Sequence, residues 1–180
     1  MGKSIIISIK PEWVAKILNG EKTIEIRKNA PKCDLPIDVY IYATKRQNLV
    51  LGDNFYGDWV TEYTITRGWS KENVEKIWGN LSGKVVAKFT LKSVDSLYFD
   101  TQKNKSEMTP IEECIIGNIE RHSCLSQDEI EAYAKPFSNS IKICYAWHIS
   151  DLEIFDEPKP LSEFGLTKAP QSWQYVEVEG

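Results

Sequence analysis

Short runs of apolar and β-branched residues recur along the chain and predict a series of short strands. SIIISI at 4–9 is a continuous apolar run, which is typical of a buried strand. TIEIRK at 23–28 alternates instead, so Ile24 and Ile26 are expected on one face and the polar side chains on the other. Other strand-like runs lie at 38–44, 84–91, 94–99, 142–149, 152–156 and 172–178, with a weaker candidate at 61–66.

Segments with helical signals lie between these runs. Pro11 suits the first position of a helix, and an apolar stripe follows it at helical spacing as far as Gly20. TPIE at 109–112 and SQDE at 126–129 match the capping box, in which a hydroxyl and a carboxylate satisfy the first amides of a helix. Residues 70–79 predict a further helix.

The order of these elements favours an α+β protein over a doubly wound one. Strands and helices do not alternate regularly, and the helix after the first strand has only about ten residues, near the lower limit for a parallel crossover. We therefore expect one domain over residues 1–180, built on a mostly antiparallel or mixed β-barrel of about six strands with short peripheral helices.

The composition is that of an ordinary globular domain. Of 180 residues, 42% are hydrophobic and 27% are charged, and no apolar run approaches the roughly 20 residues of a membrane span. The four cysteines form no C-x-x-C pair, and the two histidines do not supply zinc-ligand spacing. We therefore expect reduced thiols in a cytoplasmic protein, with no metal, no cofactor and no membrane association.

Charge is unevenly distributed along the chain, which has a net charge of −4. Residues 1–50 contain nine Lys or Arg and five Asp or Glu, whereas residues 151–180 contain two and seven. A protein that coats nucleic acid would be basic throughout, which this chain is not. A locally basic cleft would still suit one nucleotide or a short RNA.

The segment GEKTIEIRK at 20–28 places three charged side chains close together. Glu25 and Arg27 lie on one strand face, about 7 Å apart along the strand, and Lys22 follows a glycine turn. The planar fork of an arginine grips phosphates and carboxylates, and a partly desolvated lysine can act as a base. One interpretation is therefore a polar site. The other is a solvated strand face with a cross-strand ion pair worth under about 1 kcal/mol.

Two aromatic residues are harder to explain by packing than the others. Tyr42 lies on the strand expected at 38–44, and Trp173 lies in the polar stretch APQSWQY. A ring that the core does not need can stack on a nucleobase. We therefore add Tyr42 and Trp173 to the candidate ligand-binding residues.

The N-terminal stretch carries a resemblance to a known family. A strand, Pro11, a short helix, Gly-x-Lys-Thr at 20–23 and Glu-x-Arg at 25–27 resemble the opening of the ASCH domain. YIYAT, LSQDEIEAYA, YAWHIS and APQSWQY agree with it further along the chain. The resemblance covers nearly the whole chain, with insertions expected near 45–82 and 100–123.

This resemblance implies a PUA-like β-barrel with a cleft lined by Lys22, Thr23, Glu25 and Arg27. The ligands that it implies are RNA, nucleotides or modified nucleosides. The leading expectation is therefore a binding module in which charged side chains contact a phosphate or a base edge and an aromatic ring stacks on a base.

Two alternatives stay open beside the binding module. Small members of the family include acetylcytidine amidohydrolases, whose lysine matches Lys22 but whose threonine nucleophile falls at Glu25 in this chain. If the protein is an enzyme, an amidohydrolase or a ribonuclease, Lys22 and Glu25 are the expected catalytic residues. The remaining alternative is a protein interaction domain in which the charged strand is structural.

Overall fold

The computed structural model describes residues 2–45, 81–103 and 108–178. Contacts between residues divide the chain into two compact units. The first unit comprises residues up to Gly20, Ile37–Thr90 and Asp151 onward, and the second comprises Glu21–Pro36 and Leu91–Ser150. Each unit has its own cluster of buried hydrophobic side chains.

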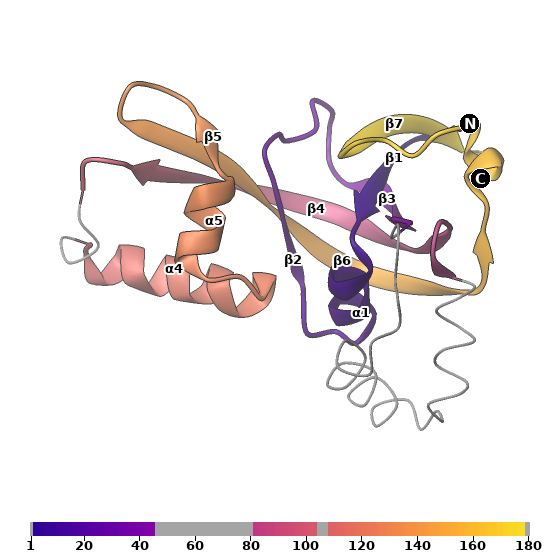
Figure 1. Ribbon diagram of the computed structural model, residues 1–180, viewed down its shortest axis with the longest axis horizontal. Helices are drawn as coiled ribbons and strands as arrows, with labels where there is room; N and C mark the ends of the chain where they lie inside the picture. Colours follow the sequence, from indigo (N-terminus) through magenta and orange to yellow (C-terminus); the bar gives the residue numbers. More distant parts are fainter. Residues whose placement is uncertain (1, 46–80, 104–107, 179–180) are drawn as a thin grey trace. The chain divides into compact units, whose positions relative to one another are not determined.

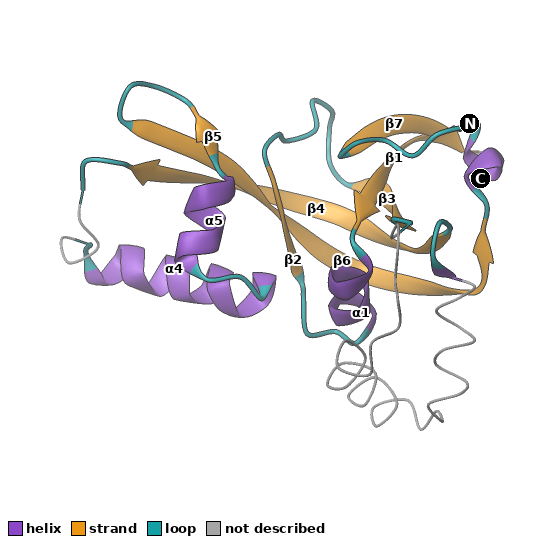
Figure 2. Ribbon diagram, in the orientation of Figure 1, coloured by secondary structure: helices purple, strands orange, loops and turns teal. Residues whose placement is uncertain are grey.

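Seven strands pair in one mixed sheet within the described residues (Figure 1, Figure 2). Six of them follow the order β2-β6-β4-β3-β1-β7, and the short β5 pairs with β6. The strands are β1 Gly2–Ile9, β2 Ile24–Arg27, β3 Ile37–Ala43, β4 Val85–Asp100, β5 Lys135–Pro136, β6 Ile141–Lys159 and β7 Trp173–Val178. The helices are α1 Pro11–Leu18, α4 Pro110–Ser123 and α5 Gln127–Tyr133, with a short 3-10 helix, η2, at Leu161–Phe164.

Strand β1 is central to the first unit because its apolar run is buried on both faces. Ile5, Ile6 and Ile7 are completely buried. β1 pairs in parallel with β3 and antiparallel with β7. The connection that joins β1 to its parallel partner β3 therefore includes α1, β2 and the chain up to Ile37. This connection has the dozen or more residues that a parallel crossover needs, which α1 alone does not provide.

In the second unit, α4 and α5 pack against β2, which comes early in the chain, and against β6, which comes late. Ile119 of α4 and Ile130 of α5 are buried with Ile24 and Ile26 of β2 and with Cys144 of β6. Because these apolar side chains come from segments far apart in the chain, their burial holds β2 and the two helices in one unit.

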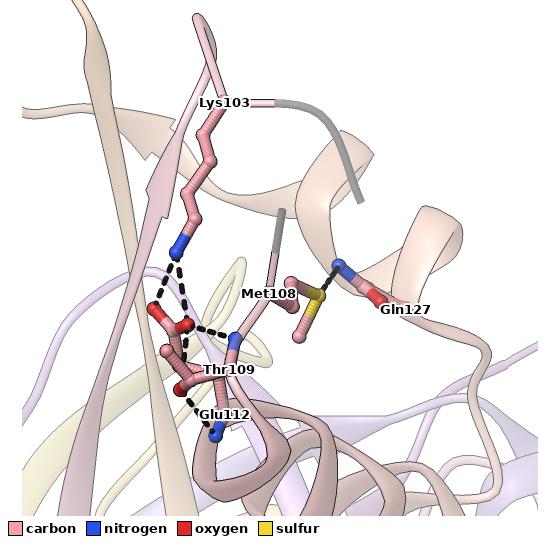
Figure 3. Close-up of polar contacts among 5 residues, drawn as sticks. All are labelled: Lys103, Met108, Thr109, Glu112 and Gln127. Carbon is pink, nitrogen blue, oxygen red and sulfur yellow. Dashed lines mark hydrogen bonds and ion pairs between the residues drawn. The ribbon is translucent and has the colours of Figure 1, made fainter. Parts of the chain in front are cut away.

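Helix α4 begins with the capping box that the sequence predicts. The Thr109 hydroxyl accepts a hydrogen bond from the Glu112 amide, and the Glu112 carboxylate accepts one from the Thr109 amide at 2.7 Å. The Lys103 ammonium also donates to both carboxylate oxygens of Glu112, and the Gln127 side-chain amide donates to the sulfur of Met108 (Figure 3). Helix α5 begins with the second predicted box, Ser126 with Glu129.

The α+β class and the mixed sheet predicted from the sequence are confirmed. Among the described residues no pairing between the end strands β2 and β7 closes the sheet, so the expected barrel is not confirmed. The runs at 84–91 and 94–99 are parts of the single strand β4. The runs at 142–149 and 152–156 are likewise parts of β6, and Asp151 between them has a left-handed φ of 50°.

Several expectations are not tested by these elements. The helix expected at 70–79 and the strand at 61–66 lie outside the described residues. The single domain and its insertions stay predictions, although most of the insertion expected near 100–123 is occupied by α4. None of the helices described is long and apolar enough to cross a membrane.

Candidate functional site

The charged segment predicted as a site begins at the turn after α1 and continues along β2. Gly20 has a φ of 79°, a left-handed conformation that glycine adopts without strain, and the chain then turns toward β2. β2 pairs antiparallel with β6, so that Glu25 lies opposite Trp147 and Arg27 opposite Tyr145. Thr23 extends this pairing through its carbonyl, which accepts a hydrogen bond from the Ile149 amide. Its own amide donates to the His122 carbonyl near the end of α4.

Lys22, Glu25 and Arg27 form one buried ionic cluster. The Lys22 ammonium lies 3.2 Å from one Glu25 carboxylate oxygen, and the Arg27 guanidinium lies 3.0 Å from the other. Their exposed fractions are 1%, 7% and 7%. All four residues of β2 are buried, so the interpretation of this segment as a solvated strand face is wrong.

The C-terminal end of α4 completes the surroundings of Lys22. The Lys22 ammonium donates a 2.7 Å hydrogen bond to the backbone carbonyl of Ser123, the last residue of the helix. Carbonyls at a helix C-terminus carry the negative end of the helix dipole, so they stabilise a cation placed there. Cys124 follows in a left-handed conformation and ends the helix directly at this contact.

Tyr133, at the end of α5, lies beside the cluster and was not singled out by the sequence pattern. The Lys28 ammonium lies 5.0 Å from the centre of its ring. Burial raises the pKa of the Tyr133 hydroxyl. The positive charge of Arg27 lowers this pKa, and the negative charge of Glu25 raises it. The signal in the sequence was a tyrosine within LSQDEIEAYA that a short amphipathic helix does not need for its core.

The two aromatic residues predicted to bind a ligand belong to the first unit, whereas the ionic cluster belongs to the second. Tyr42 is only 4% exposed and lies opposite Ser8 in the pairing of β3 with β1. Trp173 lies opposite Ile7 on β7 and makes an edge contact with Tyr175, with ring centres 5.5 Å apart. The burial of Tyr42 is that of a core residue, so its packing is explained without a ligand.

A separate cavity of about 480 Å³ lies in the second unit, between the distal half of β4 and the two helices. Apolar side chains of Leu97, Phe99, Met108 and Ile116 line it together with polar ones such as Glu131. None of the six predicted site residues is among its lining residues.

The chemistry that the Lys22–Glu25–Arg27 cluster offers is ionic. Burial raises the pKa of the Cys144 thiol to about 12, so the nucleophilic thiolate is not formed near neutral pH. In the part of the chain that the structure describes, no group of three His, Cys, Asp or Glu side chains is placed to hold a metal. The cluster therefore offers a carboxylate held between two cations, an arrangement suited to an anionic or hydrogen-bonding ligand.

A comparison with protein families decides the identity of the fold. The family model described as the ASCH domain matches residues 7–159, which is most of the chain. The chain belongs to the ASCH domain family.

Known ASCH proteins resemble the chain in sequence and in structure. An ASCH domain-containing ribonuclease from Zymomonas mobilis is 38% identical over 50 residues, which are 28% of this chain and 34% of that protein. The match thus spans about a third of the relative's length. The crystal structure of ASCH from Zymomonas mobilis has a TM-score of 0.55 and 17% identity, covering 97% of this chain and 87% of that one. The crystal structure of a mutant of that protein, in which phenylalanine replaces a tyrosine, has the same TM-score of 0.55 and the same 17% identity. The match covers 97% of this chain and 90% of the mutant's chain.

These structural likenesses support the ASCH fold. The span that matches the ASCH model contains Lys22, Thr23, Glu25, Arg27 and Tyr42. It ends before Trp173, so that residue lies outside the part of the chain that carries the family pattern.

Proposed function

We propose that this ASCH domain binds RNA or a nucleotide, with the Lys22–Glu25–Arg27 cluster as the polar centre of the site. The observation that carries the proposal is a buried carboxylate that holds two cations in fixed positions, in a member of a family with a ribonuclease among its proteins. An arginine side chain that is already held in place loses less conformational entropy when it binds a phosphate or a base edge.

The contacts and positions of the three charged residues give them different roles in this proposal. Arg27 lies at the end of β2, and its side chain is 9% exposed against 1% for Lys22, so in this proposal its guanidinium is the cation that contacts the ligand. Glu25 orients Arg27 and neutralises part of its charge. Lys22 is 1% exposed, so it positions Glu25 and would contact a ligand only after the site opens. Thr23 contributes the backbone contacts that anchor this end of β2.

A hydrolase acting in the same place is the second candidate. It is favoured by the name of the relative, an ASCH domain-containing ribonuclease, and by the 3.2 Å contact between Lys22 and Glu25. Cleavage of RNA needs a group that takes a proton and a cation that stabilises the charged phosphate. Glu25 and Arg27 would supply these, with Lys22 as their partner. The same assignment applies to acetylcytidine, for which Glu25 would have to act without a threonine nucleophile.

The binding proposal is tested by replacing Arg27 with alanine. We expect Arg27→Ala to weaken binding of a short single-stranded RNA about 10- to 100-fold, because a hydrogen bond to a charged group is worth about 1.5–3 kcal/mol. The measurement is fluorescence anisotropy at several salt concentrations. Phosphate binding would give a steep salt dependence, and binding of a nucleoside in a pocket would not.

Lys88→Ala provides the matched control for this experiment. Lys88 also pairs with a glutamate at 3.2 Å, but in the first unit and with much greater exposure. Unchanged RNA affinity of Arg27→Ala, with the variant folded, would contradict the role of the cluster. Product formed from RNA or acetylcytidine by the unmodified protein, and lost in Lys22→Ala but not in Lys88→Ala, would favour the hydrolase.

A further inference from the structure

Two stretches of the second unit carry positive charge without any carboxylate. Residues 26–33 contain Arg27, Lys28 and Lys32, and residues 132–150 contain Lys135 and Lys142. Neither stretch contains an aspartate or a glutamate, although the whole chain has a net charge of −4. A local excess of cations in an acidic protein indicates an anionic partner at this place.

The fold brings these two stretches together. β2 pairs with β6, which places Arg27 opposite Tyr145. Beyond the end of β2, the Lys135 ammonium donates to the side-chain oxygen of Asn29, and the Lys28 ammonium lies over the Tyr133 ring. α5 leads directly into β5, which lies beside β6 (Figure 1). These contacts bring Lys28 of the first stretch and Lys135 of the second to the same end of β2.

Exposed aromatic rings accompany these cations. Phe137 is 64% exposed, Tyr98 is 58% exposed and Tyr133 is 36% exposed. The rings of Tyr98 and Phe137 meet edge to face, with their centres 5.8 Å apart. A cluster of exposed aromatic rings is a feature of binding surfaces.

We propose that Lys28, Tyr133, Lys135, Phe137 and Tyr98, here called the β5 strip, bind an unpaired segment of RNA. Tyr133 and Phe137 stack on bases, and Lys28 and Lys135 contact the phosphates between them. Tyr133 is the last residue of α5, Lys135 begins β5 and Phe137 directly follows it, so the three side chains come from one short stretch of chain. The inference rests on the proposed function and extends it from the Arg27 site to the substrate class.

Single-stranded RNA fits the β5 strip better than other anionic partners. The faces of unpaired bases are open to stacking, whereas in a duplex they are covered by their neighbours. An acidic peptide would match the lysines but offers no flat ring for Tyr133 and Phe137. The carboxylates of Glu131 and Asp100 line the same cavity as Tyr98 of the strip.

The test compares a labelled 12-nucleotide single-stranded RNA with its duplex, using the complete chain. We expect Phe137→Ala and Tyr133→Leu each to weaken single-strand binding about 5- to 100-fold, because stacking on an aromatic side chain is worth about 1–3 kcal/mol per base. Phe137→Trp should retain the affinity. Lys135→Ala should reduce the slope of log affinity against log salt by about 0.7.

Ile111→Ala is the matched control, because Ile111 is the most exposed of the large hydrophobic side chains described and lies outside the strip. If the unmodified protein binds the RNA and the strip variants bind equally well, the strip is contradicted while the proposed function stands. If duplex RNA binds as tightly as the single strand, stacking is contradicted. If the unmodified protein binds no RNA, the proposed function itself fails.

Discussion

At the scale of single residues, the position of Glu25 determines the behaviour of the whole cluster. Its two carboxylate oxygens are each committed to one cation, Lys22 on one side and Arg27 on the other. Lys22 has a second acceptor in the Ser123 carbonyl. Removing Glu25 therefore leaves two nearly buried cations facing each other, whereas removing Lys22 leaves Glu25 with Arg27.

We predict that Glu25→Gln destabilises the protein more than Lys22→Met. Breaking a buried ion pair costs about 3–5 kcal/mol, and Lys22→Met should fall near the lower end because Glu25 keeps one partner. Urea denaturation measures both free energies of unfolding. Lys88→Met, which breaks an exposed pair, should cost under about 1 kcal/mol. Equal costs for all three variants would contradict a buried cluster.

The sequence predicted these three residues but not their surroundings. Alternation along TIEIRK was enough to place Glu25 and Arg27 on one strand face, because side chains in a strand alternate with a period of two. It was not enough to predict their burial, since the carbonyl of Ser123 lies 101 positions from Lys22 in the sequence. Tyr133 was missed for the same reason, because its contact with Lys28 depends on how α5 packs.

At the scale of elements, the two ends of α4 have different partners. Its first turn is held by the capping box and by Lys103, and its last turn presents the Ser123 carbonyl to Lys22. The capping box was readable from the sequence because all of its atoms lie within four residues. The contacts at the other end were not, because they are made with the segment before β2.

We predict that Glu112→Gln removes a pH-dependent contribution to stability. Hydrogen bonds from Lys103 and from the Thr109 amide and hydroxyl lower the pKa of Glu112 to about 2, from an ordinary value of 4.5. A carboxyl with a depressed pKa stabilises the fold fully above its unfolded value, and this contribution is lost as the pH falls from about 4.5 to about 2. The stability difference between the original protein and the variant should therefore shrink over this range.

Thermal unfolding at several pH values measures this difference. Glu113→Gln removes the same charge from the same helical turn and provides the control. A profile for Glu112→Gln that is no steeper than the control profile would contradict the role of the capping carboxylate.

Strands were predicted better than their pairing. The runs at 4–9, 23–28, 38–44 and 172–178 correspond to β1, β2, β3 and β7. The parallel pairing of β1 with β3 was not readable, because it depends on the long connection that carries β2 away to β6. The expected barrel followed from the order of the predicted elements as well as from the family resemblance, and it is not confirmed by the pairings described.

At the scale of the whole molecule, the two units share their longest strands. β4 passes from the first unit into the second after Thr90, and β6 passes back after Ser150. Neither unit can lose its sheet without breaking hydrogen bonds of a strand that continues into the other. The two units are therefore expected to unfold together.

We predict that a cavity made in the second unit destabilises the first unit equally. Ile130 is completely buried in the core of the second unit, so Ile130→Ala should cost about 2–5 kcal/mol. Hydrogen exchange of the β1 amides, which belong to the first unit, should report the same loss as exchange of the α5 amides. Protection of β1 that stays unchanged would show that the units unfold separately.

The left-handed backbone at Asp151 also limits how this position can evolve. A strand residue with φ near 50° is strained for most side chains, by about 1–2 kcal/mol, while glycine adopts it freely and asparagine and aspartate tolerate it. Glycine and asparagine are both one nucleotide change away from an aspartate codon. Drift at this position is therefore expected to move among these three residues, and a β-branched residue there would require the path of β6 to change.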